Sequence, residues 1–405
     1  MTTKLSHTEK INTVKVTSSN VISKFGDILF DYVNSVFLSS VANGGLWLSL
    51  YQSSEVFISV IFNFLGGVLS DTGNRKKIIW HCDLISGLVC ILLAIFIPHV
   101  FFIYAIIIIN IILAIISSYR SPAYKAVFRE IVQKEHLNQV NSVLEIAKQV
   151  IQITGPTGAL IIAHFFGNRF ALIFDGISFI ISGLLIRKLT ILSAPVKKKS
   201  SKKTFSQIRE GLNYIFHNRE ILIIITFSSI VNFVIAGYNL ILPFSTYAFS
   251  DSHLKAYAVL LTAESIGGLL GATASTLIKK TPTTNKLLFL IFLDGLALMP
   301  SERIYHLSHS IILVAICISL FNFFLSIFNI QFMTFVQVRT DMNYIGRVFG
   351  TFFSVAILFM PIGTFFFKFA FNLQNPNNYF VLGSLLTLIS IITIILNTIF
   401  NSKIN

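Results

Sequence analysis

The chain has 405 residues, of which 54% are hydrophobic and only 12% are charged, and it carries a formal net charge of +14. Soluble domains usually contain about 25% charged residues, so this composition excludes an ordinary soluble protein. Residues 100–119 and 379–400 contain no Asp, Glu, Lys or Arg and reach the roughly 20 residues that a helix needs to cross about 30 Å of hydrocarbon. We therefore expect an all-α integral membrane protein.

In chain order, residues 1–19 are polar and lack the apolar core and cleavage site of a signal peptide. We expect them to form a cytoplasmic N-terminal tail ahead of a retained first helix. The apolar segments that follow predict about 12 transmembrane helices in two pseudo-symmetric six-helix bundles. The spans are expected near residues 20–43, 47–70, 77–97, 100–119, 141–163, 170–190, 221–245, 256–278, 287–301, 308–330, 346–369 and 379–400.

The main break in hydropathy falls at residues 191–220, which contain a basic block at 197–203. It predicts a cytoplasmic linker between an N-terminal bundle, residues 20–190, and a C-terminal bundle, residues 221–400, with a cytoplasmic tail at 401–405. The basic block is either a solvated topology signal or a contact with anionic lipid. Because the positive charge is spread over several loops, we expect a lipid bilayer as partner and no nucleic acid.

Positive residues lie mostly on one side of this topology. If the N-terminus is cytoplasmic, only four of the 31 Lys and Arg residues lie outside, namely Arg169, Lys255, Arg303 and Lys368. This asymmetry fits the positive-inside rule and places both termini in the cytoplasm.

The two halves resemble each other when they are shifted by about 205 to 209 residues. Pro156 then meets Pro361, Glu55 meets Glu264, and Lys77 meets Lys286. Duplicated halves around a midplane site are a recurring transporter design.

Carboxyl groups inside the spans are candidates for binding protons or a cationic substrate, because a charge in hydrocarbon costs several kcal/mol and usually serves a function. Asp31, Glu55 and Glu264 are the preferred candidates. Asp27 shares a helical face with Asp31, and the alternatives are that Asp27 pairs with Lys24 and that Glu55 makes only structural hydrogen bonds. Asp175 and Asp294 are further intramembrane carboxyls, and His81 and Asp83 are expected at the membrane interface.

Motifs for catalysis are absent from the sequence. It has no GxxxxGK[ST] nucleotide loop, no HExxH zinc pair and no GxSxG nucleophile. Its three cysteines lack CxxC spacing. We expect no catalytic, metal-binding or cofactor-binding residues, so a gradient rather than ATP would drive transport.

A short polar turn, GGVLSDTGNRKK, separates the second and third spans. It places Asp71 at a helix end close to Arg75 and Lys76, where these charges can either latch the cytoplasmic face or mark a simple positive turn. The pattern formed by Gly67, Asp71, Asn74, Arg75 and Lys76 resembles the signature loop of the Major Facilitator Superfamily, with Thr72 where that family has an Arg.

The fifth span contains TGPTGAL, with Gly155, Pro156 and Gly158 and with Ala159 in the last position. Its proline can bend the helix and its glycines permit close packing, either as a pivot or as ordinary small-residue packing. It is similar to the Gly-Pro-x-x-Gly-Gly motif of drug:proton antiporters within that superfamily.

The cytoplasmic loops also resemble those of macrolide-efflux-like exporters in the superfamily, at YRSPAYKAVFREIVQKEHLNQVNSVLEIAKQ and FMTFVQVRTDMNYIGRVFG. This resemblance implies a bacterial cytoplasmic-membrane protein, a monomer, that exports amphipathic, macrolide-like drugs by proton-coupled alternating access. The alternatives are export of an endogenous metabolite such as a siderophore or lipid, and a non-transporting membrane scaffold or immunity protein.

Overall fold

The computed structural model describes residues 6–72, 74–133, 137–192, 213–249, 256–278, 282–340 and 345–402, with the side chains of some helical residues, including 63–72, left out. The described residues form helices and connecting turns, with no β-strand among them. The all-α membrane prediction is confirmed. In this part of the chain, eight helices are long and apolar enough to cross a membrane, and two shorter apolar helices are Val150–Ile162 and Ala356–Ala370.

The chain divides into two units, Met1–Ser201 and Lys202–Asn405. The first contains α1 (His7–Ser40), α2 (Gly44–Thr72), α3 (Arg75–Phe96), η1 (His99–Phe101), α4 (Phe102–Ile131) and α5 (Leu137–Arg187). The second contains α7 (Arg219–Ile241), η3 (Leu242–Phe244), α8 (Ser245–Ala248), α9 (Ala256–Thr276), α10 (Thr284–Leu298), α11 (Ser301–Ser308), α12 (Ile311–Arg339), α13 (Ile345–Ala370) and α14 (Asn377–Ser402). Most of the expected linker, residues 193–212, lies outside the described residues.

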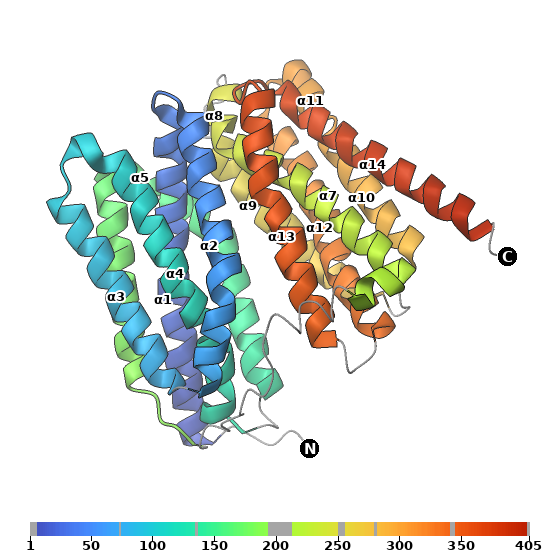
Figure 1. The fold of residues 1–405 in the computed structure, drawn as a ribbon. Helices are drawn as coiled ribbons and strands as arrows, with labels where there is room; N and C mark the ends of the chain where they lie inside the picture. Colours follow the sequence, from blue (N-terminus) through green and yellow to red (C-terminus); the bar gives the residue numbers. More distant parts are fainter. Residues whose placement is uncertain are drawn as a thin grey trace. The chain divides into compact units, whose positions relative to one another are not determined.

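The same helix pairs pack in both units. In the first unit α1 lies against α5, α2 against α4, and α3 against α5, and Figure 1 shows these helices side by side. In the second unit α7 lies against α13, α9 against α12, and α10 against α14. A Cβ on Gly87 would lie 2.6 Å from the backbone oxygen of Gly176, and one on Gly295 would lie 2.6 Å from that of Gly383. These glycines are 208 and 207 positions apart (295 − 87 and 383 − 176), which supports the internal repeat.

The helix α5 covers two expected spans, residues 141–163 and 170–190. Its backbone leaves the helical region at Gly167, with φ 74° and ψ −179°. Such a positive φ is accessible to glycine at little cost but not to residues with a side chain. Gly167 therefore joins two helical segments that the hydropathy pattern separates.

The first helix begins at His7, earlier than the expected span at residue 20. Ser6 and Glu9 form a capping box in which Glu9 N donates to Ser6 Oγ (3.3 Å) and Ser6 N donates to Glu9 Oε2 (2.9 Å). Further along, the buried Asn12 donates to the carbonyl oxygens of Ile131 (3.1 Å) and Thr190 (2.8 Å) and accepts from Thr190 N (3.0 Å). The capping box thus starts the helix at residue 7. The bonds of Asn12 hold this polar segment against the ends of other helices.

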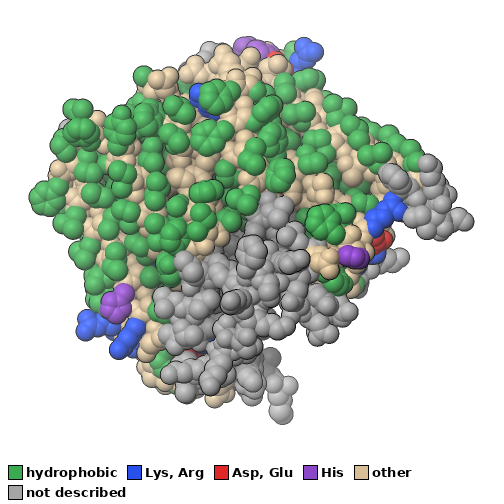
Figure 2. All heavy atoms as spheres, viewed as in Figure 1, with side chains coloured by type: hydrophobic (Ala, Val, Ile, Leu, Met, Phe, Trp, Pro, Cys, Tyr) green, Lys and Arg blue, Asp and Glu red, His purple; other side chains and the backbone are tan. Residues whose placement is uncertain are grey.

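The outer surface agrees with a membrane environment. Figure 2 shows hydrophobic side chains over the sides of both units, with Lys, Arg and His side chains near their ends. Exposed apolar residues follow one face of α3 at Ile85, Leu88, Leu92 and Ile95, which are between 44% and 56% exposed. This face lies in position to contact lipid.

Candidate functional site

A polar cavity of about 140 Å³ lies within the first unit. Each water occupies about 30 Å³ in the liquid, so the cavity has room for a few waters or a small ion. Four carboxyl groups and two cationic side chains line it. Its polar lining consists of Lys24, Asp27, Asp31, Glu55, Ser59, Ser86, Asn110, Ser117, Arg120 and Asp175.

Two of the preferred carboxyl candidates, Asp31 of α1 and Glu55 of α2, face this cavity. Both side chains are exposed. Tyr51 donates a hydrogen bond to Asp31 Oδ1 at 2.7 Å, and Tyr51 precedes Glu55 by one helical turn on α2. Asn110 of α4 supports this helix by donating to the carbonyl oxygen of Tyr51 at 2.8 Å. The structure therefore brings Asp31 and Glu55 to one site.

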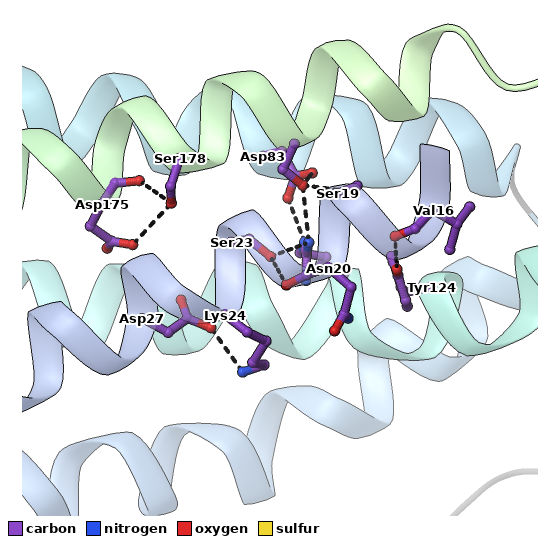
Figure 3. Close-up of polar contacts among 12 residues, drawn as sticks. Val16, Ser19, Asn20, Ser23, Lys24, Asp27, Asp83, Tyr124, Asp175 and Ser178 are labelled. Atoms are coloured by element: carbon purple, nitrogen blue, oxygen red, sulfur yellow. Dashed lines mark hydrogen bonds and ion pairs between the residues drawn. The ribbon is translucent and has the colours of Figure 1, made fainter. Parts of the chain in front are cut away.

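A lysine also faces the cavity, but it already has a partner. Lys24 Nζ lies 2.8 Å from Asp27 Oδ2, one turn along α1 (Figure 3). This is the pairing expected as the alternative role for Asp27. The lysine thus forms its contact ion pair with Asp27 rather than with Asp31 or Glu55.

The second cation of the cavity, Arg120 of α4, is held in a buried network. Figure 3 labels Ser19, Ser23 and Asp83 of this network. Arg120 forms an ion pair with Asp83 of α3, and Arg120 Nη2 donates to Ser23 Oγ at 3.3 Å. Ser182 of α5 donates to Asp83 Oδ2 at 2.9 Å and shares a 2.7 Å hydrogen bond with Ser19. Together these bonds join α1, α3, α4 and α5 at one level of the unit.

Sequence reasoning missed this network. Arg120 falls in a segment interpreted as a cytoplasmic loop, but the structure continues α4 through it to Ile131. Asp83 is fully buried rather than interfacial, whereas His81 is exposed, with Nδ1 2.7 Å from the carbonyl oxygen of Lys77. The available signal was the helical periodicity of the segment that follows Arg120.

Asp175 of α5 lies at the inner wall of the cavity and is fully buried. Ser178 donates to the carbonyl oxygen of Asp175 at 2.7 Å and lies 3.5 Å from Asp175 Oδ1 (Figure 3). A Cβ on Gly26 would lie 2.6 Å from Asp175 Oδ1. Glycine at position 26 thus lets α1 pass close to this carboxyl group.

The third candidate, Glu264 of α9, lies in the second unit. Tyr238 of α7 donates to Glu264 Oε1 at 2.5 Å. Each unit therefore holds one carboxyl group against a tyrosine. Asp294 of α10 is fully buried, and neither of its carboxyl oxygens has a hydrogen-bond partner in the described part of the chain.

The signature turn is only partly described. Gly67 and Asp71 belong to the last turns of α2, and the side chain of Asp71 is outside the described part of the chain. Asn74 caps α3 by accepting from Lys77 N at 3.0 Å. Arg75 Nη1 lies 2.6 Å from Glu130 Oε1 of α4, and Lys76 Nζ donates to the carbonyl oxygen of Leu189 at 2.8 Å. Both basic side chains are thus bonded to groups of their own unit.

The motif in α5 packs against α1. A Cβ on Gly155 would lie 2.9 Å from Ile28 Cγ2, and one on Gly158 would lie 3.1 Å from the ring of Phe25. Pro156 is buried within α5, and the break in helical backbone lies eleven residues later (167 − 156), at Gly167. The described geometry shows close helix packing at this motif.

The family model of the Major Facilitator Superfamily matches residues 25–364. The chain belongs to this superfamily. It is therefore a multi-pass membrane transporter rather than an enzyme.

Two relatives illustrate the similarity in sequence. The "uncharacterized MFS-type transporter YkuC" of Bacillus subtilis (strain 168) is 28% identical over 261 residues, and this alignment covers 61% of the chain and 59% of YkuC. "Macrolide efflux protein A" of Streptococcus pyogenes is 21% identical over 374 residues, which are 90% of each protein.

Solved transporter structures share the fold. The nucleoside transporter NupG has a TM-score of 0.76 with 11% identity, covering 94% of this chain and 98% of that one. The POT family transporter PepTSo has a TM-score of 0.74 with 13% identity, covering 96% and 98%. The D-xylose-proton symporter has a TM-score of 0.69 with 13% identity, covering 95% and 97%.

Proposed function

We propose that this transporter exports amphipathic, macrolide-like drugs from a bacterium in exchange for protons. It would act as a monomer in the cytoplasmic membrane, with both termini in the cytoplasm. We infer proton coupling from the excess of carboxyl groups over cationic side chains in the cavity of the first unit. The similarity to macrolide efflux protein A over 90% of both proteins supports the drug class.

The charge of the cavity can be followed group by group. Lys24 is paired with Asp27, and Arg120 is paired with Asp83, which lies behind the cavity wall. Asp31, Glu55 and Asp175 then form no ion pair among the described residues. Because a charged side chain inside a membrane span costs several kcal/mol, these carboxyl groups favour a bound proton or a cation.

The volume of the cavity suits a proton site but not a drug site. Pockets for drug-sized ligands usually measure about 300–1,000 Å³, whereas this cavity measures about 140 Å³. We assign proton binding to Asp31 and Glu55 and do not place the whole drug there. Glu264, hydrogen-bonded to Tyr238, is proposed as the second unit's carboxyl in the same process.

Coupling follows if protonation and drug binding favour different conformations. A ligand shifts a conformational equilibrium only through its different affinities for the two states. Protonation of Asp31 or Glu55 removes a negative charge and so changes whether the inward-facing or the outward-facing state is favoured. Asp71, Arg75 and the α5 motif are proposed to affect the barrier between these facings.

The test is accumulation of a labelled macrolide in an efflux-deficient bacterium that expresses the chain, with and without a protonophore. We expect lower accumulation with the transporter, restored by the protonophore. Asp31→Asn and Glu55→Gln should each abolish this effect while the protein still reaches the membrane. Glu302→Gln is the matched control, because Glu302 lies on α11 and contacts only His306 among charged groups of the described residues.

Two results would contradict the proposal. Unchanged macrolide accumulation, with the protein confirmed in the membrane, would remove the drug class and favour a native metabolite. Full export by the Asp31→Asn, Glu55→Gln double variant would show that the cavity carboxyls do not carry the coupling proton.

A further inference from the structure

A second depression lies on the outer surface of the first unit, between α3 and α4. Its volume is about 560 Å³, four times that of the carboxyl-lined cavity (560/140). One end is polar, with Asn74, Lys77 and His81, and the rest is mainly apolar. No acidic side chain is among its lining residues. The groove therefore combines an apolar channel with a positive end.

Lys77 is the basic group of this region that remains available. Of three consecutive basic residues, Arg75 is paired with Glu130 and Lys76 is bonded to the carbonyl oxygen of Leu189. Lys77 is exposed, and its ammonium group has no bonded partner within the described part of the chain. His81 lies one turn further along α3, and its Nδ1 donates to the carbonyl oxygen of Lys77, so its Nε2 donates to an external anion in the imidazolium form, in which both nitrogens carry a proton.

The apolar part of the groove continues into the exposed face of α3. Ile78, Cys82 and Ile85 line the groove from this helix, and the exposed residues Leu88, Leu92 and Ile95 follow at helical spacing. Ile85 lies about 12 Å along α3 from Lys77 at 1.5 Å per residue. This length fits within one leaflet, which is about half of a 30 Å hydrocarbon core.

The position of the polar end agrees with a lipid head group. The membrane-spanning segment of α3 runs from Arg75 to Phe96, so Lys77 and His81 lie where the span begins. Figure 2 shows Lys, Arg and His side chains at the end of the first unit where α3 starts, next to a continuous hydrophobic surface. Tyr119 of α4, whose ring contacts Phe62 at 6.5 Å between centroids, completes this end with a polar hydroxyl.

We propose that this groove is a binding site for an anionic phospholipid of the phosphatidylglycerol type. Its phosphate would contact Lys77, Asn74 and His81, and one acyl chain would follow Ile85 along α3. The site is separate from the carboxyl-lined cavity, so the proposal does not depend on the identity of the exported drug.

The first experiment compares lipid retention by native mass spectrometry on the full-length protein, purified in detergent with phosphatidylglycerol or phosphatidylcholine. We expect preferential retention of phosphatidylglycerol. A basic residue near an anionic surface contributes about 1 kcal/mol, so Lys77→Gln should lower this retention about fivefold, and the Lys77→Gln, His81→Gln double variant should lower it further.

Lys286→Gln is the matched control for Lys77→Gln. Lys286 is the repeat partner of Lys77, is exposed, and lies at the start of α10 in the second unit, where Leu290 occupies the place of His81. Non-specific attraction of anionic lipid to positive helix ends would make the two single variants equal, and that result would overturn the proposal. A specific groove requires the larger loss for Lys77→Gln.

The second experiment locates the bound lipid with Cys82, which lines the groove. Cys82 is half-buried, whereas Cys90 and Cys317 are buried, so a maleimide should label Cys82 first. Phosphatidylglycerol should slow this labelling several-fold in the native sequence but not in the Lys77→Gln, His81→Gln variant. Equal rates with and without phosphatidylglycerol, or equal protection by phosphatidylcholine, would overturn the assignment.

Discussion

Two adjacent glycines of α9, Gly267 and Gly268, provide a direct test of helix packing in the second unit. A Cβ on Gly267 would meet the backbone of Ser319 in α12, 2.7 Å from its carbonyl carbon and 2.9 Å from its Cα, where ordinary contacts begin at 3.4 Å. A Cβ on Gly268 would meet nothing within 4 Å. Gly267→Ala therefore requires a displacement of at least 0.7 Å (3.4 − 2.7) between α9 and α12.

The two substitutions should change the free energy of unfolding by different amounts. Alanine favours a helix over glycine by up to about 1 kcal/mol, and both variants share this gain. Overpacking costs about 1–3 kcal/mol and affects only Gly267→Ala. We expect Gly268→Ala to be neutral or stabilising and Gly267→Ala to be less stable than Gly268→Ala by about 1–3 kcal/mol.

The assay is the apparent melting temperature of each detergent-purified variant, measured by loss of the monodisperse peak after heating. Gly267 follows Glu264 by three residues, on the same helical face. Gly267→Ala should therefore also disturb the hydrogen bond between Glu264 and Tyr238. Equal melting temperatures for Gly267→Ala and Gly268→Ala would refute the close α9–α12 contact.

Two other predictions concern the first unit. Asp83→Asn should cost about 3–5 kcal/mol because it leaves Arg120 with an uncompensated buried charge, and adding Arg120→Gln should recover part of the lost melting temperature. If the double variant melts below Asp83→Asn, the two groups do not act as a pair. Asn12→Ala should speed tryptic cleavage after Lys15, because it removes three hydrogen bonds to other helix ends and leaves backbone groups unsatisfied at about 1–3 kcal/mol each. Val14→Ala, at a position that is 64% exposed, should leave the cleavage rate unchanged, and an equal effect of both would contradict this role of Asn12.

The sequence was sufficient for the membrane class and the superfamily, and its two preferred carboxyls of the first half, Asp31 and Glu55, both line the cavity. Long charge-free runs identify membrane spans because crossing the hydrocarbon core depends only on the length and local composition of the helix. Asp31 and Glu55 could be recognised because a carboxyl group within such a run is unusual. Their meeting at one cavity depends on the packing of α1 with α2, which the sequence pattern did not specify.

The N-terminal segment shows what a polar pattern leaves open. Residues 1–19 were expected to form a cytoplasmic tail, and the structure adds that residues 7–19 are the helical start of α1. Ser6 and Glu9 have the spacing of a capping box, which is a sequence signature of a helix N-terminus. Asn12 is buried because it bonds to Ile131 and Thr190, residues more than a hundred positions away that local patterns do not reveal.

The ion pair between Asp83 and Arg120 shows a different limit. These residues are 37 positions apart, on α3 and α4, and each alone looks like an interfacial charge near the end of a span. Only the tertiary structure places the carboxylate against the guanidinium and adds Ser182 from α5. The free-energy cost of burying the two charges is then lowered because each charged group has hydrogen-bonding partners.

The two repeats agree in their glycine contacts but differ in some of their polar and charged side chains. Gly87 with Gly176, and Gly295 with Gly383, occupy corresponding positions because a close backbone crossing admits no side chain in either unit. The charged groups repeat only in part: Glu264 corresponds to Glu55, but the position before Gly87 is Ser86, which lines the cavity, whereas the position before Gly295 is Asp294, which is buried. Since side chains can change without moving the backbone, the repeat can preserve its helix crossings while its polar groups diverge. The glycine contacts thus belong to the shared fold, and we assign the proposed proton coupling mainly to the first unit.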